Sequence, residues 1–148
     1  MLKFSRKVDY GLILLSKLRE EPTAASAREV AERYRLPQPM VANILKALTN
    51  AGILASTRGA QGGYELARAP RDITLSDLVQ ALEGPFSLVE CTSDEPNCKF
   101  ISLCPTHDPL QVVHRKFEEF MNGLTIEEII GPSRSFHFSP PTNAQAQP

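Results

Sequence analysis

The stretch Ser26-Ala-Arg-Glu-Val-Ala-Glu-Arg-Tyr-Arg-Leu-Pro-Gln-Pro-Met40 holds the signals of a helix, a sharp turn and the start of a second helix. Ser26 and Glu29 have the spacing of a capping box, which predicts a short first helix. Pro39 suits the first position of the second helix, and Gly52 is expected to end it. The apolar positions expected to face inward in that second helix are Val41, Ile44, Leu45 and Leu48. The pattern is helix, turn, helix.

A glycine-rich turn between two short strand-like segments follows the second helix. Residues 52–57 and 64–67 have strand character, and the basic tip Arg58-Gly-Ala-Gln-Gly-Gly63 joins them, so we expect a hairpin. A helix-turn-helix followed by a hairpin is the pattern of a winged helix.

Two more helices are expected to complete this domain. One begins at the cap Thr74 and ends at Gly84-Pro85, so the winged domain should span residues 1–84. The other is amphipathic and ends before Glu21-Pro22; its inward positions are Val8, Leu12, Leu15 and Leu18.

The second half of the chain predicts a loop, a long helix and a tail. Residues 85–108 are expected to form the loop, and 109–130 a long helix from Pro109 with a short helix after it. The tail 131–148 lacks apolar anchors, which favours disorder. Apolar residues of the long helix step by three and four, which indicates a dimerisation seam; they are Leu110, Val113, Phe117, Phe120 and Leu124. The predicted fold class is therefore mainly α with a small β-hairpin wing, a winged helix-turn-helix plus a long C-terminal dimerisation helix.

Charge is divided unevenly along the chain, although the net charge is only −1. Residues 1–71 hold 12 Lys/Arg against 6 Asp/Glu, whereas residues 72–148 hold 4 against 11. A basic half suits a module that contacts nucleic acid, because neutralising phosphates supplies most sequence-independent affinity. The short apolar patch 11–15 is too brief for a signal peptide or a membrane span, so we expect a cytoplasmic protein with no membrane partner.

Candidate DNA-binding residues follow from the winged-helix pattern. The second helix of a helix-turn-helix enters the major groove with its N-terminal residues toward the bases. Amide side chains can pair with adenine, and a methionine can contact a thymine methyl; the residues concerned are Gln38, Pro39, Met40 and Asn43. Arg58 and Gly59 at the hairpin tip suit a narrow minor groove. Plausible phosphate contacts in the first turn are Lys3, Arg6 and Lys7.

All three cysteines lie in one loop, in the pattern Cys91-x6-Cys98-x5-Cys104-x2-His107. Thiolates are soft ligands that favour iron-sulfur clusters or zinc, and a nearby imidazole can complete four ligands. Zinc sites more often space their cysteines by two to four residues, so the wide gaps favour a cluster. Zinc, redox-active thiols and inert packing remain open from spacing alone.

The winged-helix pattern, the cysteine loop, Ile73-Thr-Leu-Ser-Asp-Leu78 and Leu124-Thr-Ile-Glu-Glu-Ile129 together resemble the iron-sulfur-sensing winged-helix repressors, the IscR/SufR/NsrR-type regulators. The resemblance covers residues 1 to about 130. It implies a homodimer joined through the long helix, which binds an operator in double-stranded DNA. It also implies that Cys91, Cys98 and Cys104 bind one cluster per subunit. The favoured cluster type is 2Fe-2S, and 4Fe-4S is the alternative.

The resemblance offers two candidates for a fourth ligand. His107 matches the histidine of the cluster-assembly regulators, and it is favoured because a local ligand requires no exact dimer geometry. Asp9, supplied by the partner subunit, matches the aspartate of the nitric-oxide sensors. Ala42 stands where the assembly regulator has a glutamate that tunes site choice, so the operator sequence does not carry over.

The sequence therefore predicts a transcription regulator, acting as a repressor of cluster-assembly genes under the control of an iron-sulfur cluster. The alternatives are a nitric-oxide, redox or iron-sensing repressor of the same family, and a winged-helix repressor with structural zinc. An enzyme using Cys104 with His107 is disfavoured because no third residue orients such a pair.

Overall fold

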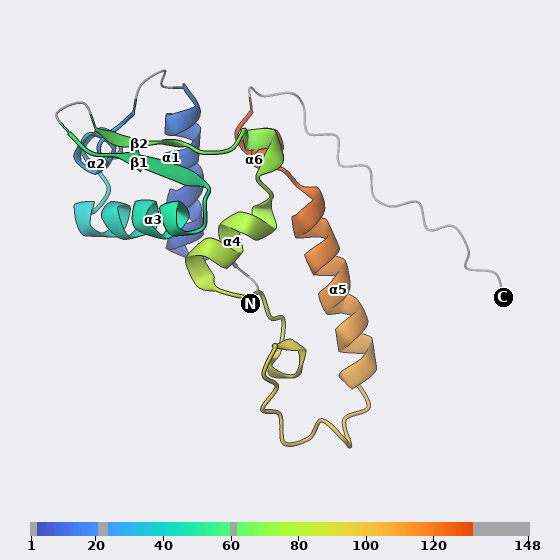
Figure 1. Ribbon diagram of the computed structural model, residues 1–148. Helices are drawn as coiled ribbons and strands as arrows, with labels where there is room; N and C mark the ends of the chain where they lie inside the picture. The colour runs from blue at the N-terminus through green and yellow to red at the C-terminus, as the bar shows by residue number, and fades with distance from the viewer. Residues whose placement is uncertain (1–2, 21–23, 60–61, 132–148) are drawn as a thin grey trace.

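The computed structural model describes residues 3–20, 24–59 and 62–131. Residues 132–148 of the predicted tail, and Glu21-Pro22 beyond the first helix, lie outside these ranges. In chain order the elements are α1 (Arg6–Glu20), α2 (Ala27–Tyr34), α3 (Gln38–Asn50), β1 (Leu54–Thr57), β2 (Gly63–Leu66), the 3-10 turn η1 (Pro70–Asp72), α4 (Leu75–Glu83), the 3-10 turn η2 (Glu90–Thr92), α5 (His107–Gly123) and α6 (Ile126–Ile130). The fold is mainly α with one two-stranded sheet, as the sequence predicts (Figure 1).

The helix-turn-helix forms from local signals. The Ser26 hydroxyl accepts a hydrogen bond from the Glu29 N–H, and the Glu29 carboxylate accepts one from the Ser26 N–H at 2.7 Å, which completes the capping box. Helix α3 begins one residue earlier than predicted, so Pro39 is its second residue. A proline is tolerated there because the N–H groups of the first helical turn have no partner inside the helix.

The hairpin pairs Leu54 with Leu66 and Thr57 with Gly63 in antiparallel register. Its first strand starts two residues after Gly52, which has φ +69° and closes α3 through its N–H on the Thr49 carbonyl. The predicted stop at Gly52 is confirmed, and the predicted strand start at residue 52 is wrong, because that residue belongs to the helix end.

The hairpin is also fixed to the chain ahead of α2. Ala25 and Tyr64 exchange two backbone hydrogen bonds of 2.9 and 3.1 Å, a one-residue bridge beside the sheet. Helix α3 and the hairpin are therefore joined through α2 as well as through the α3–β1 connection.

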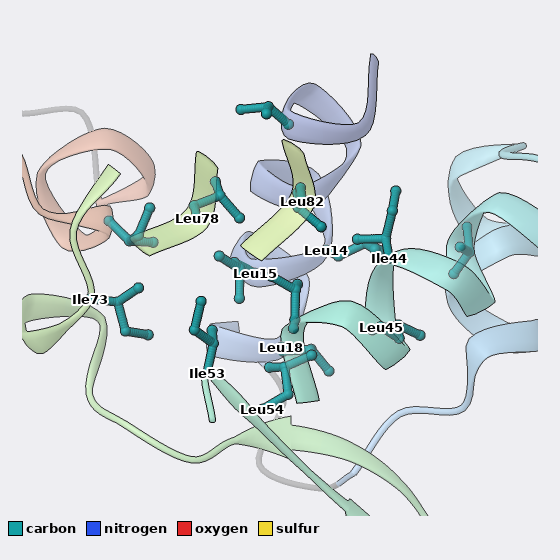
Figure 2. Close-up of a cluster of buried hydrophobic side chains, with 14 of the residues drawn as sticks. Leu14, Leu15, Leu18, Ile44, Leu45, Ile53, Leu54, Ile73, Leu78 and Leu82 are labelled. Atoms are coloured by element: carbon teal, nitrogen blue, oxygen red, sulfur yellow. The ribbon is translucent and has the colours of Figure 1, made fainter. Parts of the chain in front are cut away.

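The core lies between α1, α3, α4 and the base of the hairpin (Figure 2). Its fully buried side chains include Leu14, Leu15, Ile44, Leu45, Leu48, Ile53, Ile73 and Leu78. The inward positions predicted for α3 are all buried, as are three of the four predicted for α1, with Leu12 half-buried. Helix α3 packs into this core through its buried residues and leaves its opposite face to solvent.

The chain leaves the core after α4, and helix α5 runs back toward the core and leads into α6 (Figure 1). Helix α5 begins at His107, two residues before the predicted Pro109, which occupies its first turn without needing a hydrogen-bond partner. The Leu75 N–H donates to the Leu124 carbonyl at 2.8 Å, and the Ile126 N–H donates to the Ile73 carbonyl at 2.8 Å. The C-terminal end of α5 is therefore attached to the start of α4, while its N-terminal end projects beside the loop (Figure 1). Within the described ranges, no helix is both long and apolar enough to cross a membrane.

Candidate DNA interface and cysteine loop

The N-terminal half of α3 presents polar side chains to solvent. Gln38, Pro39 and Asn43 are exposed, and Met40 is half-buried. Their exposure is set by helical periodicity, because Val41, Ile44 and Leu45 on the other face of the helix are buried in the core. The structure therefore gathers the four predicted recognition residues at one end of one helix.

The wing tip lies on the same side of the molecule as the N-terminal end of α3, away from α5 (Figure 1). Arg58 is exposed directly after β1, and Gly59 has φ +122°, a backbone conformation that other residues rarely adopt. Recognition helix and wing can thus approach one DNA duplex together, through adjacent grooves.

The basic first turn is divided between solvent and α4. Lys3 and Arg6 are exposed. Lys7 is also exposed, but its ammonium lies 3.4 Å from the Leu82 carbonyl and 3.9 Å from the Glu83 carboxylate, at the C-terminal end of α4. A cation at this end complements the helix dipole, so Lys7 joins α1 to α4.

The sequence analysis did not single out two exposed cations in or beside α3, Lys46 and Arg35. Lys46 follows Asn43 by three residues and so shares its helix face, a spacing that could have revealed it. Arg35 occupies the turn between α2 and α3.

The cysteine loop begins with an anchored segment. Cys91 lies in η2, and its carbonyl accepts a 2.8 Å hydrogen bond from the Gln111 amide of α5. The buried Thr92 hydroxyl accepts from the Leu88 and Val89 N–H groups and donates to the Val89 carbonyl at 2.8 Å. These bonds hold the first predicted ligand against α5.

The end of the loop is ordered by α5 itself. The Cys104 sulfur lies 3.2 Å from the Thr106 hydroxyl, and this hydrogen bond lowers the pKa of the Cys104 thiol. His107 is the first residue of α5, and its Nδ1 contacts the Asp108 carboxylate at 2.8 Å, which leaves Nε2 for another partner. Asp9 is exposed in the first turn of α1, as a ligand for a second subunit would be.

The donor types suit a soft metal or cluster, but the described chain does not gather them. Cys91, Cys98 and Cys104 are free, partly exposed thiols. Among residues 3–20, 24–59 and 62–131, no three His, Cys, Asp or Glu side chains lie in a group that could hold a metal ion. Between η2 and α5 the backbone forms only turns, so thiolate ligation would require that segment to rearrange.

Apolar side chains are exposed on α5 and in the loop. Val113 and Phe120, two of the five predicted seam residues, are 40% and 50% exposed. Phe117 is half-buried, and its ring centroid lies 6.4 Å from that of Phe86 within the same chain. Other exposed apolar side chains are Phe100, Ile101, Leu103 and Val112. Several large apolar side chains exposed on neighbouring segments are typical of an interaction face.

A winged helix with a solvent-facing recognition helix and a basic tip defines the class of winged-helix DNA-binding regulators. The family model described as "Iron-dependent Transcriptional regulator", the Rrf2 family, matches residues 4–132. The chain belongs to the Rrf2 family of transcriptional regulators.

Individual relatives agree with this assignment. The HTH-type regulator CymR of Bacillus subtilis is 38% identical over 102 residues, which cover 66% of this chain and 72% of CymR. The solved structure of this global cysteine regulator superposes with a TM-score of 0.69 at 30% identity, covering 90% of this chain and 100% of that chain.

Two other relatives carry the names IscR and NsrR, the regulator types that the sequence resembles. The structure of T. potens IscR has a TM-score of 0.68 at 28% identity and covers 94% of this chain and 93% of that chain. The repressor NsrR of Streptomyces coelicolor is 27% identical over 130 residues, 88% of this chain and 87% of NsrR. The prediction of a regulator rather than an enzyme is confirmed.

Proposed function

We propose that this protein is a repressor whose affinity for an operator in double-stranded DNA depends on an iron-sulfur cluster. The observation that carries the proposal is the confinement of all three cysteines, free and partly exposed, to the single loop between the winged domain and α5. The family description, an iron-dependent regulator, supports iron over other metals.

Cys91, Cys98 and Cys104 would hold the cluster. The favoured cluster type is 2Fe-2S, and 4Fe-4S is the alternative. When bound, the cluster would supply a group whose occupancy and redox state depend on iron supply and on oxidants. For the fourth ligand, His107 is favoured over Asp9 of the partner subunit, because its Nε2 is free and it lies three residues from Cys104.

The protein's own residues would position the cluster. Thr106 favours the thiolate form of Cys104, which is the form that binds metals. Gln111 and Thr92 hold the Cys91 end of the loop. We propose residues 1–84 as the DNA-binding unit, 85–108 as the cluster-binding loop, and 109–130 as the dimerisation helix with the short helix after it.

The coupling between cluster and DNA would be indirect. The loop lies at the bottom of the view in Figure 1, away from the N-terminal end of α3, so we expect the cluster not to contact the DNA bound by its own subunit. In a homodimer joined through Val113 and Phe120, loop order would instead fix the separation of the two recognition helices. A palindromic operator tolerates little error in that separation. The cluster would act as a ligand that favours one arrangement, with an effect limited to its differential affinity.

Cluster-assembly genes are the proposed targets, as the resemblance to the assembly regulators implies. The competing hypotheses are a nitric-oxide or redox sensor that uses Asp9, and a repressor with structural zinc. Chromatin immunoprecipitation with the full chain would identify the promoters bound and so distinguish the pathways.

The decisive experiment compares protein purified anaerobically with protein stripped of metal. We expect visible absorption, matching iron and sulfide contents, and a clear difference in affinity for promoter duplexes recovered by immunoprecipitation. Colourless protein with one zinc per subunit would establish the zinc alternative. Equal affinity of the loaded and stripped forms would overturn cluster control.

A further inference from the structure

Arg35 has an unusual backbone conformation for its residue type. Its φ and ψ are 52° and 40°, and it is the one non-glycine residue with positive φ among residues 3–20, 24–59 and 62–131. This left-handed region is unfavourable for side chains with a Cβ, so glycine usually occupies it.

The fold requires the conformation but not the arginine. Arg35 ends α2: its N–H donates to the Glu32 carbonyl at 3.3 Å, and the Leu36 N–H donates to the Ala31 carbonyl at 2.9 Å. Glycine would make the same backbone bonds without strain. The Arg35 side chain is exposed and makes no hydrogen bond or ion pair within the described chain. Within the described residues, the Arg35 side chain therefore makes no contact that offsets the strain of its backbone.

The charge of Arg35 is also locally unneutralised. The nearest acid in sequence, Glu32, is bound to Arg28 at 2.8 Å. A strained residue kept without internal compensation indicates a role outside the fold.

The position of Arg35 indicates what that role is. It lies three residues before Gln38, the first residue of α3. When the N-terminal end of such a helix enters the major groove, the preceding turn borders the sugar-phosphate backbone. A guanidinium there can bind a phosphate oxygen through two N–H groups.

We propose that Arg35 is a phosphate-binding residue that sets the register of α3 on DNA, at the expense of strain in the α2–α3 turn. The proposal rests on the DNA-binding role of α3. Arg35 would raise the affinity for DNA of any sequence, and base recognition would remain with the side chains of α3.

The test compares full-length Arg35→Gly and Arg35→Lys with the wild type. The probes are a random-sequence duplex of about 30 base pairs and a duplex selected with the wild-type protein, each measured over a range of salt concentrations. Arg35→Gly should weaken binding to both duplexes by a similar factor of about 3 to 10, and reduce the slope of log affinity against log salt by about 1. Arg35→Lys should keep most of the slope. Arg35→Gly should also unfold at a higher temperature, because the strain is removed.

Arg71→Gln is the matched control, since it removes one exposed positive charge at η1, outside the helix-turn-helix. An equal loss of slope in Arg71→Gln would overturn the contact in favour of a net-charge effect. If Arg35→Gly binds DNA with wild-type affinity and salt slope while Arg58→Ala binds more weakly, the proposed role of Arg35 is overturned. The DNA-binding role of the protein would then still stand. Failure of the wild type to bind either duplex would overturn the DNA-binding function itself.

Discussion

The ring of Phe86 stacks on the ring of His114, with centroids 5.4 Å apart and planes within 7° of parallel. Phe86 opens the loop just after α4, and His114 is buried on α5, where its Nε2 lies 3.4 Å from the Glu118 carboxylate. This aromatic contact thus joins the start of the loop to the long helix α5.

Phe86→Ala should destabilise the protein by about 2 kcal/mol, because half-buried aromatic area and the ring pair are both lost. The change in the free energy of unfolding is measured by chemical denaturation monitored with circular dichroism. Phe100→Ala is the control: Phe100 is 71% exposed, so its truncation should leave stability unchanged. Equal stability of the two variants would contradict an anchoring role for Phe86.

On α3, Asn43→Ala should relax sequence preference at particular base pairs by about 1–3 kcal/mol, since base contacts carry sequence information. Asn50→Ala is matched, because it removes an exposed asparagine from the C-terminal end of the same helix. Binding to the selected duplex and to its single-base variants measures the difference. Indistinguishable profiles for the two variants would remove Asn43 from the base-reading residues.

Arg58→Ala should weaken operator binding by about 1–3 kcal/mol if the wing enters the minor groove. Competition with netropsin, a minor-groove ligand, should then weaken wild-type binding far more than binding of Arg58→Ala. An effect on both proteins alike would place Arg58 outside the minor groove.

The double change Val113→Glu and Phe120→Glu should yield monomers, because the two residues are seven apart and share an exposed face of α5. Light scattering gives the mass in solution. Arg115→Glu, also exposed on α5, should stay dimeric. Phe117→Glu is less informative, since Phe117 also packs near Phe86 within its own chain. A dimeric double variant would show that this face is not the seam.

Each of Cys91→Ala, Cys98→Ala and Cys104→Ala should abolish the visible absorption and shift operator affinity equally, with helical content preserved. Comparison of His107→Ala with Asp9→Ala identifies the fourth ligand from the rate of cluster loss. Unchanged operator affinity in all three cysteine variants, measured anaerobically against loaded wild type, would rule out sensing and leave a winged-helix DNA binder.

The local structure was predictable because its causes are local. Ser26 with Glu29 forms the expected capping box, the expected cap Thr74 forms one with Asp77, and Gly52 and Gly84 end their helices with positive φ. Caps, glycine stops and apolar spacing act within one or two turns of chain. Element boundaries were less accurate at Pro39 and Pro109, because a helix start accepts proline at any of several positions.

The sequence by itself determined the winged helix, the polar N-terminal end of α3 and the grouping of three thiols in one loop. Only the tertiary structure decided that Ala25 bridges Tyr64, that Lys7 binds the end of α4, and that His114 is buried under Phe86. These contacts join segments far apart in the chain, and each depends on how whole helices pack around a shared core. Packing of that kind leaves no periodic signal in either segment alone, because the pairing is set by the shape and free energy of the assembled fold.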